Sequence, residues 1–286
     1  MHIRRTGGAL GAEISDIRLT AVSAEERAAL AVALAEYGVL FLRNQYLSPA
    51  DFQAFAAGFG EVMSHPAYGE VADAPGVQIL ESTPEVPSKI EMWHSDMTFR
   101  RDPPLATALM ADVIPEYGGD TLWTSSRAAW QALSPAMRDF LAPLGAIHDF
   151  RHGFRESLAE PGGEERLADA VRSNPPVVHP IARRLDGDDD GALFVNSLFT
   201  TRICDLAAAE SKDLLEFLHR HLTTEEFTTR LRWEPGTVVI WDNRSTQHKP
   251  VNDYFPQHRR LHRVTVCGDV PQPLDPRYAR QPASCP

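Results

Sequence analysis

The segment "WHSDMTF", residues 93 to 99, places a histidine and an aspartate two positions apart in an otherwise apolar and aromatic run. If this segment is extended, His94 and Asp96 point to the same face, because side chains alternate along a strand. Both could then bind one metal ion from a strand and its end. The chain has 11 histidines and 39 acidic residues, so composition alone produces about 1.5 such pairs, and a third ligand must decide.

A histidine much further along the chain supplies the third ligand. His248 follows the strand-like segment "TVVIWDN", residues 237 to 243, and we expect the strand to break into a polar loop there. Two histidines and one carboxylate on one face form a facial triad, which leaves coordination positions of an octahedral Fe(II) open. On spacing alone, a purely structural role for these three residues remains an alternative.

The composition of the whole chain narrows the class of protein. Its 286 residues are 43% hydrophobic, which predicts one domain, residues 1–286, with a sizeable core. The net charge of -11 and the pI near 5.4 argue against a nucleic-acid partner. Three cysteines without a C-x-x-C pair indicate neither a disulfide framework nor a zinc knuckle. With no signal-like start and no apolar run long enough for a membrane, we expect a soluble, cytoplasmic protein.

Capping residues and hydrophobic periodicity predict helices and strands along the chain. Ser23 and Ser48 cap predicted helices that Gly38 and Gly60 end, and further helices are expected at 134–144 and 205–222. Strand-like segments lie at 39–43, 105–114, 177–185, 192–196, 226–233, 237–243 and 263–270. Many short strands with long excursions favour a mainly β fold with helical inserts, a β-sandwich or jelly roll, over a parallel βαβ sheet.

The acidic segment "DGDDDG", residues 186 to 191, begins like a calcium-binding loop. Ser197 stands where such a loop requires a bidentate glutamate. The segment is therefore predicted to be a solvated hairpin turn, since aspartate and glycine are typical of tight turns.

A run of arginines follows His248 in "QHRRLHRVTV", residues 257 to 266. By strand alternation Arg259 and Arg263 share a face and stand about 13 Å apart. They could bind two separate anions. The alternative interpretation is a solvated charged face.

Together with "YGGDTLW" (117 to 123), "WDNRSTQH" ending in His248 and "RRLHRVTVCGD" (259 to 269), the His94-x-Asp96 pair resembles the taurine dioxygenase (TauD/TfdA) family. This resemblance implies a double-stranded β-helix (jelly-roll) core and an Fe(II) ion bound by His94, Asp96 and His248. It also implies that 2-oxoglutarate and O2 are cosubstrates. An arginine and a threonine of the family hold the far carboxylate of 2-oxoglutarate, and by position these are Arg259 and Thr121.

The resemblance also assigns a pocket for a small anionic organic substrate. His65, Tyr68 and Arg263 would hold the anion, and Phe154 would form an apolar wall. Ile90 stands where taurine dioxygenases have an asparagine near the amino end of the substrate, and an apolar side chain cannot solvate an ammonium group. His65 and Tyr68 could instead belong to a loop that only packs over the core.

The implied reaction hydroxylates the carbon next to sulfur in taurine or a related alkylsulfonate. It releases sulfite and an aldehyde, with succinate and CO2, and serves sulfur metabolism. Ile90 makes an alkyl sulfate ester an attractive alternative, and a phenoxyalkanoate fits the same anion pocket. A non-enzymatic 2-oxoglutarate-binding metal sensor is a further alternative. The family often forms dimers or tetramers, so a homodimer or homotetramer is expected.

Overall fold

The computed structural model describes residues 1–65, 68–185 and 191–280. A solvated turn was expected at residues 186 to 191, and residues 186–190 of this segment lie outside the described part of the chain. Within it, helices and strands contribute comparable lengths, so the fold is mixed, and the expectation of a mainly β chain is met only in part.

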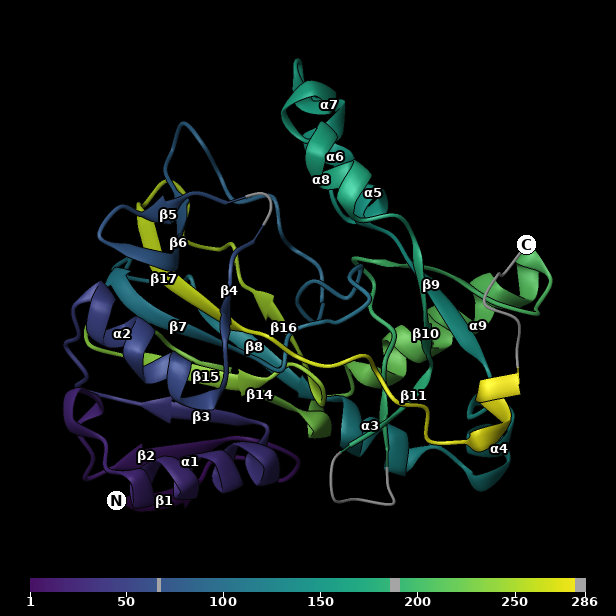
Figure 1. The fold of residues 1–286 in the computed structure, drawn as a ribbon, viewed down its shortest axis with the longest axis horizontal. Coiled ribbons are helices and arrows are strands. Elements are labelled where there is room, and N and C mark those ends of the chain that lie inside the picture. Colours follow the sequence, from purple (N-terminus) through teal and green to yellow (C-terminus); the bar gives the residue numbers. More distant parts are fainter. Residues whose placement is uncertain (66–67, 186–190, 281–286) are drawn as a thin grey trace.

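A nine-stranded sheet, the main sheet, occupies one half of the molecule (Figure 1). Its strands, in spatial order, are β1 (His2–Arg5), β2 (Ala12–Ser15), β3 (Val39–Leu42), β15 (Val238–Asp242), β7 (Ala106–Val113), β17 (Arg259–Val266), β6 (Ala74–Ser82) and β5 (Glu70–Val71), with β4 (Val62–Met63) also on β17. The pairs in this sheet are antiparallel except for β2 and β3, which α1 (Ala24–Tyr37) connects. The preference for antiparallel strands is therefore confirmed apart from this one βαβ unit.

The two helices predicted near the start of the chain are present, with their predicted N-terminal caps. Ser23 and Glu26 make the reciprocal capping box of α1, and Gly38, at φ 71°, follows the helix. Ser48 caps α2 (Pro49–Ala56), which ends four residues before Gly60 because the chain continues as the 3-10 turn η2 (Ala57–Phe59). Three other 3-10 turns are η1 (Leu19–Ala21), η3 (Glu225–Phe227) and η4 (Pro276–Arg280).

Both faces of the main sheet are buried. On one face, Leu40 and Leu42 of β3 pack in a core with Phe52 of α2. The other face packs against a three-stranded sheet, which consists of β14 (Thr228–Leu231), β8 (Thr121–Ser125) and β16 (Thr246–Pro250). The rings of Trp123 and Trp241 meet between the two sheets with centroids 5.8 Å apart. Burial on both sides explains why β3 and residues 238 to 241 of β15 are uninterrupted apolar runs.

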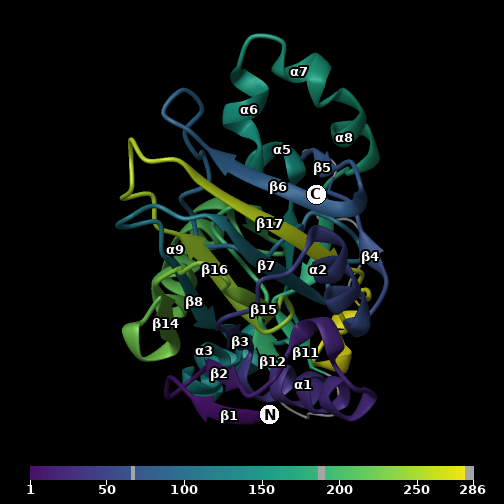
Figure 2. The same ribbon diagram turned by 90° about the vertical axis from the view of Figure 1, so that its left-hand side faces the viewer.

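A smaller unit packs beside the two sheets. It contains a sheet of β10 (Val177–Pro180), β9 (Gly145–His148) and β13 (Thr200–Ile203), the pair β11 (Ala182–Arg184) and β12 (Gly191–Leu193), and the helices α3 (Ser126–Ala132), α4 (Pro135–Leu141) and α9 (Ala208–Leu222). Between β9 and β10 the chain forms a projecting arm of short helices (Figures 1 and 2). The arm consists of α5 (Phe150–Gly153), α6 (Arg155–Ala159), α7 (Gly163–Arg166) and α8 (Ala168–Ser173). No helix among the described residues is both long and apolar enough to cross a membrane.

Candidate metal and anion site

His94 and His248 face each other across a single β-bridge. The His94 amide donates to the His248 carbonyl at 3.0 Å, and the His248 amide donates to the His94 carbonyl at 2.8 Å. Their ring centroids are 4.2 Å apart. His248 lies within β16, so the expectation of a polar loop at this residue is wrong. The chain turns for only a few residues after β15 and then pairs with β8.

Asp96 is placed by a turn and by a buried amide. The extended conformation expected for residues 93 to 99 ends before Asp96, where the chain turns, and Met97 has a left-handed φ of 49°. The side chain of Asn243 accepts a hydrogen bond from the Asp96 amide at 2.7 Å and donates to the Asp96 carbonyl at 3.0 Å. Asn243 is fully buried and was not identified from the sequence, because only its position in space shows that it holds this ligand.

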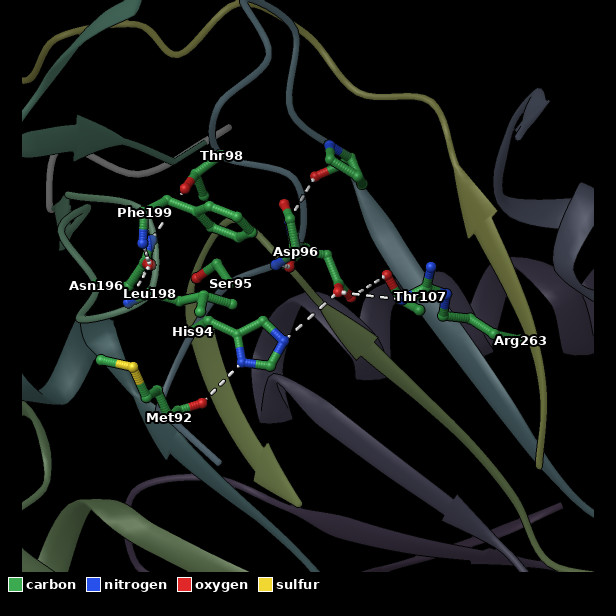
Figure 3. Close-up of polar contacts among 12 residues, drawn as sticks. Met92, His94, Ser95, Asp96, Thr98, Thr107, Asn196, Leu198, Phe199 and Arg263 are labelled. Atoms are coloured by element: carbon green, nitrogen blue, oxygen red, sulfur yellow. Dashed lines mark hydrogen bonds and ion pairs between the residues drawn. The ribbon is translucent and has the colours of Figure 1, made fainter. Parts of the chain in front are cut away.

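The three side chains form one buried cluster. His94, Asp96 and His248 each offer a ligand atom, and these atoms lie within 4.8 Å of one another. His94 Nδ1 is 2.9 Å from the Met92 carbonyl, which only accepts hydrogen bonds, so Nδ1 carries the proton (Figure 3). The lone pair of Nε2 then faces Asp96 Oδ1 at 3.8 Å. In metal sites, a hydrogen bond from the nitrogen that does not bind the metal, such as the one from Nδ1 to the Met92 carbonyl, fixes the tautomer of the histidine.

The charges of the cluster suit a divalent cation. Burial alone would raise the pKa of Asp96, but its neighbours, His248 first and then Arg263, His94 and the Thr107 hydroxyl, together outweigh burial and lower this pKa to about 2. Burial, and secondly His94, lowers the pKa of His248 to about 3, and burial also lowers the pKa of His94. At neutral pH the cluster is thus one carboxylate with two neutral imidazoles, the protonation state that metal binding requires.

The donor set fits Fe(II). Nδ1 of His248 is buried and has no hydrogen-bond partner in the described part of the chain. Two imidazoles and one carboxylate are the ligands of a facial triad, which binds iron and leaves positions open for other groups. The three residues selected from sequence spacing are therefore brought together, as predicted.

Arg259 and Arg263 lie on one face of β17, as strand alternation predicted. Their exposed fractions are 8% and 5%, so the alternative of a solvated face is wrong. In each guanidinium Nη2 is buried without a hydrogen-bond partner among the described residues. Buried cations normally have partners, so each arginine offers a free donor to an anion.

Aromatic rings fix the guanidinium of Arg259. It lies over the rings of Trp233 and Tyr254, at 6.0 and 5.8 Å from their centroids, and its Nε donates to the Gly119 carbonyl at 3.1 Å. The indole N–H of Trp233 donates to the Thr121 hydroxyl at 3.0 Å. Trp233 therefore contacts both residues that the family resemblance assigns to 2-oxoglutarate, and the sequence did not single it out.

Arg263 lies between the ligand cluster and a tyrosine. Its Nη1 is 3.6 Å from Asp96 Oδ1, and its guanidinium lies 4.7 Å from the centroid of the Tyr68 ring. Figure 3 shows His94 and Arg263 approaching Asp96 from different sides, with the Thr107 hydroxyl donating to the same carboxylate at 2.8 Å. Arg263 thus directly borders the ligand cluster of His94, Asp96 and His248.

The other predicted substrate residues gather beside Arg263. The rings of His65 and Tyr68 are 4.6 Å apart, and the rings of His65 and Phe154 are 6.0 Å apart. Phe154 and Ile90 pack against a buried apolar cluster, which contains Met97, Phe99, Phe150, Ala170, Leu198 and Phe199. The structure therefore places an aromatic and apolar surface next to the second arginine.

Two buried histidines hold the chain just after Asp96. His179 Nε2 is 2.9 Å from each of the Thr98 and Arg100 carbonyls, and His148 Nδ1 is 2.9 Å from the Thr98 hydroxyl. Burial lowers the pKa of His148 well below its ordinary value and that of His179 to about 4. Both histidines are neutral at physiological pH and support the turn that carries Asp96.

The chain matches the family described as "Taurine catabolism dioxygenase TauD, TfdA family" over residues 2–265. The chain belongs to the TauD/TfdA family of Fe(II)- and 2-oxoglutarate-dependent dioxygenases. It is thus an enzyme of this class, and His94, Asp96 and His248 form a facial triad of the kind that binds iron.

Similar proteins cover nearly the whole enzyme. It is 34% identical to an alkylsulfatase of Acinetobacter baylyi, over 94% of this chain and 86% of the relative. It is 33% identical to an alpha-ketoglutarate-dependent sulfate ester dioxygenase of Pseudomonas putida, over 98% and 94%. An alpha-ketoglutarate-dependent sulfonate dioxygenase of Saccharomyces cerevisiae is 31% identical, over 95% of this chain and 68% of the relative. Alpha-ketoglutarate is another name for 2-oxoglutarate.

Solved structures share the fold. A taurine dioxygenase from Burkholderia xenovorans superposes with a TM-score of 0.81 at 33% identity, covering 95% of this chain and 91% of that one. AAD-2 in complex with Mn(II) and N-oxalylglycine gives a TM-score of 0.78 at 27% identity, covering 96% and 99%.

Replacing a ligand should remove metal binding without unfolding the enzyme. We expect His94→Ala or Asp96→Ala to abolish stoichiometric Co(II) binding, measured by calorimetry, because two remaining ligands cannot complete the triad. Circular dichroism should show retained secondary structure, and His2→Ala, at an exposed histidine, should bind Co(II) like the unchanged enzyme. Full stoichiometric binding by Asp96→Ala would contradict the assignment.

The metal-free enzyme should lose stability in acid. His179 takes up a proton near pH 6.5 in the unfolded chain but only near pH 4 when folded, so the free energy of unfolding should fall between these values as pH decreases. The share of His179 is about 3 kcal/mol. Urea titrations at several pH values measure this slope. His179→Gln, which keeps an amide donor but cannot be protonated, should make this slope shallower, while the other buried histidines, such as His148, still contribute. An unchanged slope would count against this cause.

Proposed function

We propose that the enzyme oxidises the carbon next to the sulfur-bearing group of an organosulfur anion with an apolar chain, an alkylsulfonate or an alkyl sulfate ester. The observation that carries this proposal is the position of Arg263. Its guanidinium has a free buried donor and borders the Asp96 carboxylate at 3.6 Å. It also contacts Tyr68, and the rings of Tyr68 and His65 connect it to Phe154 at the edge of the apolar cluster. An anion bound there would have its carbon chain next to the iron site.

Each group of site residues has a separate role in this proposal. His94, Asp96 and His248 hold Fe(II), while Thr121 and Arg259 bind the far carboxylate of 2-oxoglutarate. A guanidinium suits that carboxylate because it offers two parallel donors and stays charged at any working pH. Iron and 2-oxoglutarate, when bound, supply the oxidising chemistry with O2.

The substrate pocket combines one permanent charge with neutral donors. Burial, and secondly the nearby Arg263, lowers the pKa of His65 well below its ordinary value, so His65 is neutral. Burial raises the pKa of Tyr68, so its phenol keeps its proton and can donate it in a hydrogen bond. Arg263 is then the one cation of this trio, which matches the single delocalised charge of a sulfonate or a sulfate ester.

The apolar cluster argues for a substrate other than taurine. Ile90 and Met97 offer no acceptor to an ammonium group. Burying an unpaired ammonium is unfavourable by roughly several kcal/mol. An alkyl chain would instead gain free energy by leaving water. The similarity to an alkylsulfatase and to a sulfate ester dioxygenase supports the ester.

The products distinguish the two substrate classes. Hydroxylation of the carbon next to sulfur gives an unstable adduct that collapses to an aldehyde and sulfite. Hydroxylation of the carbon that bears the ester oxygen gives an aldehyde and sulfate. In both cases O2 and 2-oxoglutarate are consumed and succinate and CO2 are released.

We also propose that the main sheet and the three-stranded sheet form a double-stranded β-helix core within one dioxygenase domain, residues 1–286. The support is the shared apolar core, in which Phe41 of the main sheet meets Trp123 of the smaller sheet with ring centroids 5.6 Å apart.

The two arginines should separate the two anions. Arg259→Ala should raise the dissociation constant of 2-oxoglutarate about thirtyfold or more, because it removes a buried charged donor, and should change the KM of hexyl sulfate little. Arg263→Ala should do the reverse. Arg260→Ala, on the opposite face of β17 and paired with Asp112, is the matched control. Loss of 2-oxoglutarate binding in Arg263→Ala alone would reverse the two roles.

A product assay should identify the substrate class. With Fe(II), ascorbate and 2-oxoglutarate, we expect hexyl sulfate or hexanesulfonate to release succinate with sulfate or sulfite faster than taurine does. Ile90→Asn should improve taurine relative to hexanesulfonate, because it restores a polar group. Turnover of taurine above all others would contradict the argument from Ile90. Succinate only with phenoxyacetate would indicate the carboxylate reaction, and no succinate with any compound would favour the sensor.

A further inference from the structure

Gln78 lies directly opposite Arg263 in the main sheet. The two residues are paired in register between β6 and β17, so their side chains lie on the same face. Gln78 is fully buried, and Arg263 Nε donates to its Oε1 at 2.8 Å. No part of the sequence argument included this glutamine.

Chemistry fixes the orientation of the Gln78 amide. A guanidinium has only donors, so the atom that faces Arg263 must be the oxygen of the amide. The amide nitrogen Nε2 therefore points elsewhere, and it is buried without a hydrogen-bond partner in the part of the chain that the structure describes. Leaving such a donor unpaired is unfavourable, and buried polar groups of this kind are rare unless a ligand or water completes them.

Arg263 and Gln78, which are hydrogen-bonded to each other, thus each have one free donor. Nη2 of Arg263 and Nε2 of Gln78 are both buried and unpartnered among the described residues. The hydrogen bond from Arg263 Nε to Gln78 Oε1 fixes the relative position of the two side chains. The Tyr68 ring covers the guanidinium at 4.7 Å, and Asp96 lies at 3.6 Å from its Nη1. The Arg263 end of this pair therefore borders the cluster of His94, Asp96 and His248.

We propose that Gln78 is a specificity-determining residue that donates its Nε2–H to an oxygen of the substrate anion and so selects a sulfonate or sulfate group over a carboxylate. This inference rests on the proposed function, in which Arg263 binds the substrate. A tetrahedral sulfur group has three terminal oxygens and a carboxylate has two. Because the three oxygens of a tetrahedral group point in three directions, one of them can face the Gln78 amide while the other two face the donors of Arg263, His65 and Tyr68. A planar carboxylate bound to the same three side chains has no third oxygen for Gln78.

Direct binding tests this role without turnover. The enzyme is loaded with Fe(II) and 2-oxoglutarate under anaerobic conditions, and hexanesulfonate, hexyl sulfate and hexanoate are titrated by calorimetry. Gln78→Met keeps the length of the side chain but removes the amide. We expect it to raise the dissociation constants of the two sulfur anions about tenfold or more and that of hexanoate about threefold or less. Gln53→Met, at a partly buried glutamine of α2 that donates to the Pro75 carbonyl, is the control.

The other outcomes overturn the inference. Equal losses for all three anions would mean that Gln78 only positions Arg263, and unchanged dissociation constants would mean that it contributes nothing. A loss confined to 2-oxoglutarate would place Gln78 with the other anion. If Gln78→Met fails to fold, Gln78→Glu keeps the acceptor for Arg263 and removes the donor, and it must weaken the sulfur anions more than hexanoate. An unchanged enzyme that binds 2-oxoglutarate but neither sulfur anion contradicts the proposed function and overturns the inference with it. Equal losses for the three anions in the variant overturn the inference alone and leave the proposed function intact.

Discussion

The burial of the Asp96 carboxylate is the constraint on which the site depends. A carboxylate with an exposed fraction of 4% would be very unfavourable alone, and the surroundings compensate it from several sides. The Thr107 hydroxyl and the Arg263 guanidinium approach it, and two imidazoles leave room for a cation. Asn243 binds both the backbone amide and the backbone carbonyl of Asp96 and so fixes the backbone that carries the carboxylate. The site is therefore organised around one negative charge that a divalent metal completes.

Strand β17 carries the second requirement, because it sets the distance between the two arginines that we propose to bind anions. Alternation places Arg259 and Arg263 on the interior face, and pairing with β6 and β7 on both sides prevents the strand from shifting register. The aromatic rings around Arg259 and the amide beside Arg263 keep each guanidinium in place. Two similar side chains can therefore serve two different ligands within one enzyme.

The sequence predicted those features that depend on local spacing. Residues near one another in the sequence predict the caps of α1 and the shared face of Arg259 and Arg263. A family pattern predicts that His94, Asp96 and His248 form one cluster. The residues that hold these groups were not found. Gln78, Asn243 and Trp233 act across strand register or through contacts between distant segments, and a buried glutamine or asparagine has no local signature. The turn at Asp96 was missed for the same reason, since it depends on the clamp by Asn243.

The measurement that tests the central claim most directly is an anaerobic crystal structure with Fe(II), 2-oxoglutarate and hexyl sulfate. The account predicts iron on His94, Asp96 and His248, the far carboxylate of 2-oxoglutarate on Arg259, and the sulfate oxygens on Arg263. Iron bound to other residues, or the sulfate and the far carboxylate in exchanged positions, would contradict it.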